Sequence, residues 1–291
     1  MRFSIINIMF SGLLIVLLTF LCSCEDSAPT DYIPETVVEA FLLVGEPIRE
    51  IRVMKSQPIQ QEFDYNKSQI TNARSVRIIQ VQDTFNLVFA FSDSSGYFYS
   101  DTSYLVKSKT LYKLEITLDD GSFISGETMT PDISQWKHRY SDILYYPIDT
   151  VLLPTVDSIF AEWEKVPGIE YFVMSVRCLD TLEYGKYLIP STDELNRRIG
   201  KPFSRDAAYY EISNWTVLPA SRVPIFWSAF KWYGLHEFNV YVPDGNFLEW
   251  FIQYIARGQY DYRLASIKGA KGAFGSAAPI RDTAFVVKNQ P

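Results

Sequence analysis

The chain of 291 residues has few of the side chains that most often carry chemistry. It has two histidines, His138 and His236, and three cysteines, Cys22, Cys24 and Cys178. Histidine and cysteine are the usual ligands of zinc, and a disulfide framework needs several paired cysteines. We therefore expect no metal site, no cofactor and no scaffold held together by disulfides.

Positive charge is also scarce. The 27 Lys and Arg residues are outnumbered by 34 Asp and Glu residues, which gives a formal net charge of -7. Contacts to phosphate groups need clustered Lys and Arg side chains. We therefore do not expect nucleic acid as a partner. With 21% charged residues, the chain is also too polar for a protein that crosses a membrane many times.

The one long apolar run lies at the start of the chain, and residues 1–23 are predicted to be a signal peptide. Arg2 supplies a positive charge, and residues 5–21 are almost uninterruptedly apolar. A charged start followed by such a run is typical of export signals. Two alternatives are a plain N-terminal membrane anchor, for which the run is slightly short, and a cleaved signal without a lipid.

Cys24 is the predicted lipidation site. Leu21 stands three residues before it and the small Ser23 directly before it, as in bacterial lipoprotein signals, whereas Cys22 directly follows the bulky leucine. Several acyl chains on Cys24 would hold the protein at a membrane more firmly than one chain does. Residues 24–34 are acidic and apolar-poor, so they are predicted to be a solvated tether. The acidic pair after Cys24 resembles the surface-export signal of Bacteroidota lipoproteins, although a generic linker explains it equally well.

Residues 35–131 are predicted to form an antiparallel β-sandwich of immunoglobulin-like or transthyretin-like type. Short runs rich in Val, Ile, Phe and Tyr are separated by turn signals. In Tyr112–Leu118 every second residue is apolar, so one face of this strand is expected to be buried. A turn at Asp119–Ser122 then leads into a hairpin partner over residues 123–128. The other predicted strands cover residues 36–44, 48–54, 75–81 and 84–91.

Residues 132–154 show no clear period and are predicted to be a connection, and residues 155–291 a second β domain. Within it, Ser158–Tyr171 places a strand with Trp163 before a Val-Pro-Gly turn and a tyrosine. This order resembles the second and third strands of fibronectin type III domains, which implies a core position for Trp163. We therefore expect a fibronectin III-like domain.

A helical and aromatic insertion is predicted at about residues 190–235. Ser191–Leu195 offers a helix cap followed by acidic residues, and the helix is expected to end near Gly200. The glycine-rich stretch 267–276 lacks the order of a phosphate-binding loop, so tight packing or a turn explains it better. The remaining predicted elements are a strand over 238–242, a helix over 246–256 and a strand over 283–287.

The most distinctive segment is residues 226–233, which contains five aromatic side chains. Neither a helix nor a strand can place all five on one face, so some of them are expected to face a ligand or partner. The alternative is an aromatic core cluster at the edge of the sandwich. The binding residues predicted on this basis are Trp215, Phe226, Trp227, Phe230, Trp232 and Tyr233.

Catalytic patterns are missing. There is no G-x-S-x-G motif, and the two histidines lie in unlike contexts, so no Ser–His–Asp triad is expected. Glu162 and Glu164 flank a tryptophan, and two carboxylates could hydrolyse a glycoside. Solvated acids opposite a core tryptophan are the simpler interpretation. Cys178 lies in a strand-like run and is expected to be a buried, unreactive thiol. We predict that the protein is not an enzyme.

Five features spread over the chain form a joint pattern: Cys24, the Val37–Leu42 strand, Tyr112-x-Leu114-x-Ile116 before Asp120-Gly121, the Thr128–Pro131 segment and Gly272-x-Phe274-Gly275-Ser276. This pattern resembles a family of Bacteroidota outer-membrane lipoproteins classified as a domain of unknown function. Members are typically encoded beside TonB-dependent receptors, which implies a role in capture or uptake at the outer membrane. The resemblance supplies no catalytic residues.

We therefore expect a lipid-anchored protein of the outer membrane or cell surface. Its expected role is that of a non-enzymatic accessory or ligand-binding partner of a TonB-dependent transporter. Two alternatives remain. One is a structural or adhesive envelope lipoprotein, and the other is a carboxylate-based hydrolase.

Overall fold

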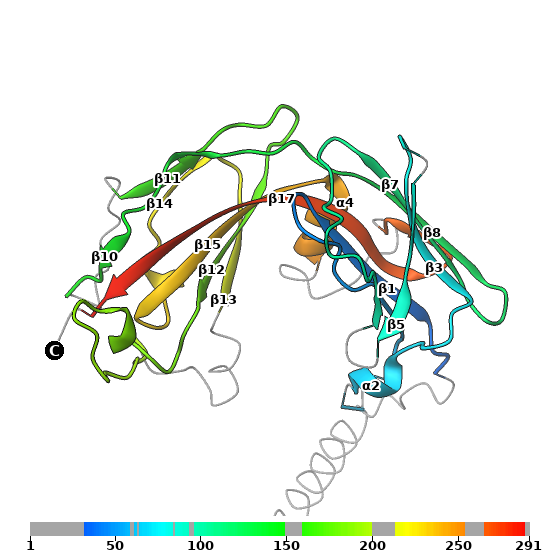
Figure 1. Ribbon diagram of the computed structural model, residues 1–291, viewed down its shortest axis with the longest axis horizontal. Coiled ribbons are helices and arrows are strands. Elements are labelled where there is room, and N and C mark those ends of the chain that lie inside the picture. The colour runs from blue at the N-terminus through cyan, green and yellow to red at the C-terminus, as the bar shows by residue number, and fades with distance from the viewer. Residues whose placement is uncertain are drawn as a thin grey trace, which may run out of the picture. The chain divides into compact units, whose positions relative to one another are not determined.

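The computed structural model describes residues 32–58, 61–62, 64–83, 85–92, 96–148, 159–199, 213–253 and 265–288. Within them the fold is mainly β with largely antiparallel pairing, as predicted (Figure 1). No helix among these residues is long and apolar enough to cross a membrane. The predicted signal peptide and Cys24 lie outside the described residues.

A five-stranded antiparallel sheet forms from the first part of the chain and one late strand. Its most regular strand is β7 (Leu111–Thr117), in which buried and half-buried residues alternate as the sequence predicted. A tight turn at Gly121 joins β7 to β8 in the predicted hairpin. The order in this sheet is β16 (Ile267–Lys268), β8 (Phe123–Met129), β7, β3 (Ser75–Gln80) and β4 (Phe85–Val88).

A larger sheet is built around one long strand, β17 (Lys271–Val287). The first part of β17 pairs in parallel with β1 (Thr36–Leu43), and its later part pairs antiparallel with β15 (Gly234–Pro243). Beyond β1 lies β2 (Arg52–Lys55). Beyond β15 lie β12 (Phe172–Cys178) and then β13 (Ser213–Leu218), while β10 (Ile143–Tyr145) pairs with the end of β17.

Gly272 explains how β1 and β17 come so close. Its φ is +109°, and a Cβ at this position would overlap the backbone carbonyl of Val38. Only glycine combines this conformation with this approach. The glycine-rich stretch 267–276 thus combines the two explanations that the sequence offered, because Gly272 packs tightly inside β17 and residues 269–270 form the bend between β16 and β17.

These pairings cross the predicted domain boundaries at residues 131 and 155. β17 lies in the second predicted domain by sequence, yet it pairs with β1 of the first. β16, also late in the chain, pairs with β8. The late segment is therefore shared between the strands assigned to the two domains.

A three-stranded sheet accompanies the later part of the large sheet. Its order is β14 (Arg222–Pro224), β11 (Phe160–Trp163) and β9 (Trp136–His138). Trp163 is fully buried, as the fibronectin III resemblance implied, and its ring lies 5.3 Å from the ring of Phe172. Strands β9 and β10 both lie within the predicted connection.

The predicted helix beginning at Ser191 is not formed. Residues 191–199 are irregular, with an isolated bridge between Glu183 and Leu195. The Asn196 side chain donates to the backbone oxygens of Asp180 (2.6 Å) and Tyr233 (2.7 Å), which ties the segment down as a loop. Polar caps without an apolar period did not suffice to form a helix.

The second predicted helix is present as α4 (Gly245–Ile252), capped by the Asp244 side chain, which accepts from the backbone N–H of Phe247. It packs on β17 and β15. The remaining short elements are α2 (Tyr65–Ser68), β5 (Ala90–Ser92), β6 (Gly96–Phe98) and the single-turn 3₁₀ helices Gly185–Tyr187 and Trp227–Ala229.

Candidate functional site

The structure divides the six predicted aromatic binding residues by exposure. Trp227, Phe230 and Tyr233 are buried, and Trp232 is half-buried. Trp215 is 37% exposed and Phe226 is 43% exposed. The segment is neither a helix nor a strand throughout, because the single helical turn at Trp227–Ala229 interrupts it. This turn sends neighbouring aromatic residues in different directions.

Trp227 and Tyr233 belong to the core. Their rings lie 5.4 Å and 5.7 Å from the ring of Tyr146, in edge-to-face contact. Edge-to-face pairs of this kind stabilise protein interiors. For these two residues the core interpretation holds, and they are not available to a ligand at the surface.

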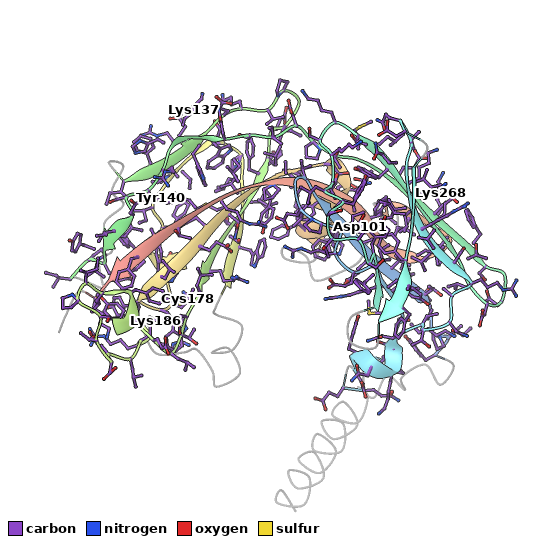
Figure 2. All side chains as sticks on the ribbon, viewed as in Figure 1. Asp101, Lys137, Tyr140, Cys178, Lys186 and Lys268 are labelled. Atoms are coloured by element: carbon purple, nitrogen blue, oxygen red, sulfur yellow. The ribbon has the colours of Figure 1, made fainter. Side chains whose placement is uncertain are left out.

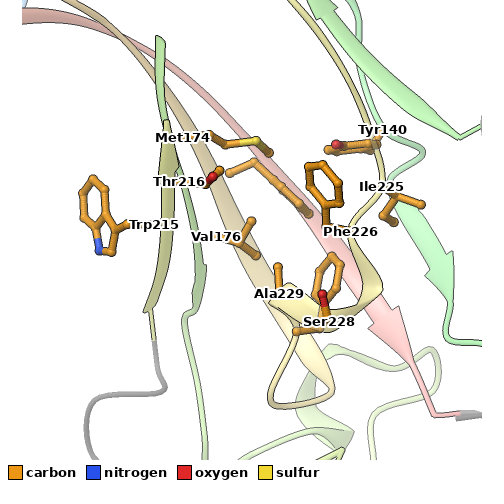
Figure 3. A pocket seen from close by; sticks show the side chains of 11 residues that line it. Tyr140, Met174, Val176, Trp215, Thr216, Ile225, Phe226, Ser228 and Ala229 are labelled. Carbon is orange, nitrogen blue, oxygen red and sulfur yellow. The ribbon is translucent and has the colours of Figure 1, made fainter. Parts of the chain in front are cut away.

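Phe226 and Phe230 line a cavity of about 240 Å³ (Figure 3). Met174 and Val176 of β12 form the opposite wall, with Phe238 of β15 beside them. Their side chains point away from the face of the sheet that carries α4, because side chains alternate along a strand. The side chains that line the cavity are largely apolar and aromatic.

The cavity lies between the two sheet layers at one edge. Thr216 of β13 and Ser228 of the helical turn supply hydroxyl groups to its lining (Figure 3). β13 is the last strand of the large sheet and β14 the last strand of the three-stranded sheet, and only residues 219–221 connect them. The cavity therefore lies where both layers end.

Trp215 lies on the other side of β13. Figure 3 shows its ring pointing away from Thr216 and Val176. It stacks on Tyr241 with 5.7 Å between ring centroids and an interplanar angle of 19°, and it contacts Phe251 of α4. Trp215 and Phe226 thus both border the cavity, but the Trp215 ring is directed to the opposite face of the sheet.

None of the described residues that line the cavity carries a charged side chain. Burial raises the pKa of its Tyr140 hydroxyl, which lies 3.3 Å from the backbone oxygen of Pro224. A neutral tyrosine and two alcohols cannot exchange protons readily near neutral pH. The arrangement is suited to holding an apolar group rather than to acid–base chemistry.

Two side chains with catalytic potential are neighbours, because Cys178 of β12 lies opposite His236 of β15 in the strand register. Both contact backbone oxygens: Cys178 Sγ lies 3.3 Å from that of Asp180, and His236 Nδ1 lies 2.9 Å from that of Gly234. His236 is buried, and burial lowers its pKa to about 4. Cys178, labelled in Figure 2, is also buried, and burial raises the pKa of its thiol to about 11. His138 is exposed and stacks on Phe160. Cys178 is thus buried, as the sequence predicted.

The paired carboxylates also stay apart from the cavity. Glu164 is exposed and Glu162 is half-buried, opposite His138 in the strand register. Among the described residues, no group of three or more His, Cys, Asp or Glu side chains could hold a metal ion.

Sequence reasoning missed the walls of the cavity. Met174, Val176 and Phe238 lie far from residues 226–233 in the chain, and nothing in their spacing links them. One indication of this site is present in the sequence: residues 226–233 contain more aromatic side chains than one strand face can bury.

No protein-family model matches the chain, and no curated protein is significantly similar to it. The molecule described so far is a mainly-β protein with an apolar cavity at the edge of two packed sheets.

Proposed function

We propose that this protein is a lipoprotein of the outer membrane or cell surface, anchored through Cys24. It acts as a non-enzymatic accessory or ligand-binding partner of a TonB-dependent transporter. The sequence Leu21-Cys22-Ser23-Cys24 after an apolar run supports the anchor. The motifs shared with Bacteroidota outer-membrane lipoproteins support the association with a transporter.

The observation that carries the binding role is the uncharged cavity beside Phe226. An exposed phenyl ring next to an apolar cavity leaves apolar surface in water, which a partner could cover. Its volume of about 240 Å³ lies below the ~300–1,000 Å³ of typical sites for small-molecule ligands. The cavity therefore suits one apolar group of a larger partner better than a whole ligand.

The partnership is tested by capture from native membranes. The tagged full-length protein is cross-linked in cells of its own species, purified and analysed by mass spectrometry. We expect a TonB-dependent receptor to be enriched. Phe226→Ala should reduce its recovery, whereas Phe98→Ala, which removes a ring that is 42% exposed elsewhere, should not. Recovery without any such receptor would contradict the proposal.

The anchor is tested separately by metabolic labelling with a fatty acid. Cys24→Ala should abolish the label, and Cys22→Ala should leave it intact. Label that persists on the Cys24→Ala protein would show that the anchor assignment is wrong.

A further inference from the structure

Among the strands that the structure describes, β13 is the last one at its edge of the large sheet. Its residues Ser213–Leu218 pair with Arg177–Phe172 of β12, and among the described residues no strand pairs with its other side. In an antiparallel ladder every second residue of an edge strand directs its N–H and C=O groups outward. These groups are a template for another strand.

The residues of β13 itself include none of those that usually protect an edge. Natural edge strands are shielded by charged residues, by proline or by bulges. The opposite edge of the same sheet, β2, begins with Arg52 and ends with Lys55, and β14 ends with Pro224. β13 reads Ser-Asn-Trp-Thr-Val-Leu and contains neither a charge nor a proline.

The β13 edge adjoins the cavity. Thr216 of β13 lines the cavity and pairs in register with Met174, which lines it as well. A strand added beside β13 would direct alternate side chains to the same side as Thr216. An apolar cavity of about 150 Å³ holds a benzene molecule. The 240 Å³ available here can therefore take one large apolar side chain.

The chain segment that borders the cavity carries a small excess of positive charge. Residues 213–231, which comprise β13, β14 and the segment with Phe226, contain Arg222 and Lys231 and no acidic residue. Glu162 of β11 lies opposite Arg222 in the strand register, so one positive charge remains in excess over these residues. The whole chain has a net charge of -7, so this strip is a local exception. Opposite charge across an interface selects partners and speeds their encounter.

We propose that β13 is a docking edge for an extended segment of a partner protein. The segment adds a strand to the large sheet, inserts one large apolar side chain beside Phe226 and carries acidic residues near that side chain. Addition of a strand to a sheet edge is an established mode of peptide recognition, in which the backbone supplies affinity and pockets supply specificity. This inference rests on the proposed function only in that the occupant belongs to a protein.

The test uses the full-length protein and a fluorescent synthetic peptide, acetyl-Glu-Thr-Val-Thr-Phe-Thr-Val-Glu-amide, with binding measured by anisotropy. A control peptide has the same composition with its apolar residues adjacent, Glu-Val-Phe-Val-Thr-Thr-Thr-Glu. We expect the alternating peptide to bind at least about tenfold more tightly than the control. Equal affinities, or no saturable binding up to about 1 mM, would overturn the inference.

Backbone pairing is tested without changing the protein. Two versions of the alternating peptide are N-methylated, one at odd and one at even positions. Only one set of amides faces β13, so one version should lose at least about tenfold in affinity and the other should not. Equal behaviour of the two versions would rule out strand addition. In parallel, hydrogen exchange of the β13 amides should slow when the unmethylated peptide binds.

The cavity is tested with two variants. Ala229→Phe places a ring in the cavity and should weaken binding of the alternating peptide at least about tenfold, and Phe226→Ala should weaken it by a similar factor. Phe98→Ala is the matched control and should change affinity less than about twofold. Unchanged affinity in both cavity variants would overturn the inference.

Two further outcomes separate this inference from the proposed function. If the protein alone forms dimers that Ala229→Phe abolishes, the occupant is a second copy and not a partner. If a TonB-dependent receptor is captured equally by wild type and Ala229→Phe, the proposed function stands and the docking edge is wrong.

Discussion

Two regions of one hydrophobic core, the first core around β7 and the second core around β12, are filled in different ways. The first is lined by aliphatic side chains on regular strands, and Ile78, Leu114 and Ile116 are completely buried. The second is filled by large rings such as Trp163 and Phe238, and it retains the cavity beside Phe226. Aliphatic residues that alternate on a strand interdigitate closely, whereas rings from irregular connections leave gaps at an edge. The cavity therefore lies where regular strands are followed by irregular segments.

The two cores also differ in how their buried polar atoms are satisfied. In the first, the Tyr112 hydroxyl accepts from the backbone N–H of Lys107 and lies 3.0 Å from the Tyr104 hydroxyl. In the second, the indole N–H groups of Trp163 and Trp227 have no hydrogen-bond partner among the described residues. An unpaired buried donor costs about 1–3 kcal/mol. These two unpaired donors should therefore reduce the contribution of the second core to the free energy of unfolding.

The largest effect is expected from a substitution in β17, the strand that both cores share. Gly272→Val should cost more than about 4 kcal/mol or prevent folding, because its side chain would overlap Val38 at a positive φ. Gly121→Val has a similar positive φ but open space around it, so it should cost only about 1–2 kcal/mol. Urea unfolding measures both, and equal losses would contradict the role of Gly272.

The same truncation in each core should have unequal effects. Ile116→Ala should lower the free energy of unfolding by about 4 kcal/mol, since its side chain is enclosed on all sides. Ile225→Ala should lower it by about 2 kcal/mol, because that side chain already borders the cavity. Guanidinium unfolding of both variants tests the difference, and a larger loss for Ile225→Ala would reverse the comparison.

Acid should act on the second core through His236. Burial lowers its pKa to about 4, so the unfolded chain binds a proton at this site between about pH 4 and pH 6.5 while the folded chain does not. The contribution of His236 to the free energy of unfolding should therefore decrease as the pH drops from about 6.5 to about 4, by up to about 3 kcal/mol. His236→Phe should lose this component of the pH dependence in thermal unfolding, and an unchanged pH profile would contradict it.

The smallest effect is expected from filling the cavity. Ala229→Phe should change the free energy of unfolding by less than about 1 kcal/mol, because the new ring enters existing space. Ala40→Phe in the closely packed first core should cost more than about 3 kcal/mol. Similar losses for the two variants in thermal unfolding would show that the cavity does not accept a ring.

The regular parts of the fold were predictable from sequence. Alternation in Tyr112–Leu118 defined β7 and its buried face, and the Asp119–Ser122 turn defined the hairpin. Both signals are local, since they follow from side-chain direction and turn conformation. The core position of Trp163 followed from the resemblance to fibronectin type III domains.

The shared strand and the site were not predictable in the same way. Gly272 and its neighbours are weak strand formers, and only the close approach of β1 makes them part of β17. The cavity combines residues of β12, β13 and β15 with the segment containing Phe226, so no spacing along the chain encodes it. The exposed position of Phe226 depends on the helical turn that follows it.

The pairing of β1 with β17 also sets an order of events during folding. Val37 pairs with Lys271, so the contact closes a loop that spans nearly the whole chain. Contacts between such distant residues slow folding, because the entropy of closing the loop is lost before the contact is gained. A chain that emerges from its N-terminus first cannot complete either core until β17 has arrived. Folding of both cores therefore waits for β17, and a product truncated before β17 would lack the strand that pairs with both β1 and β15.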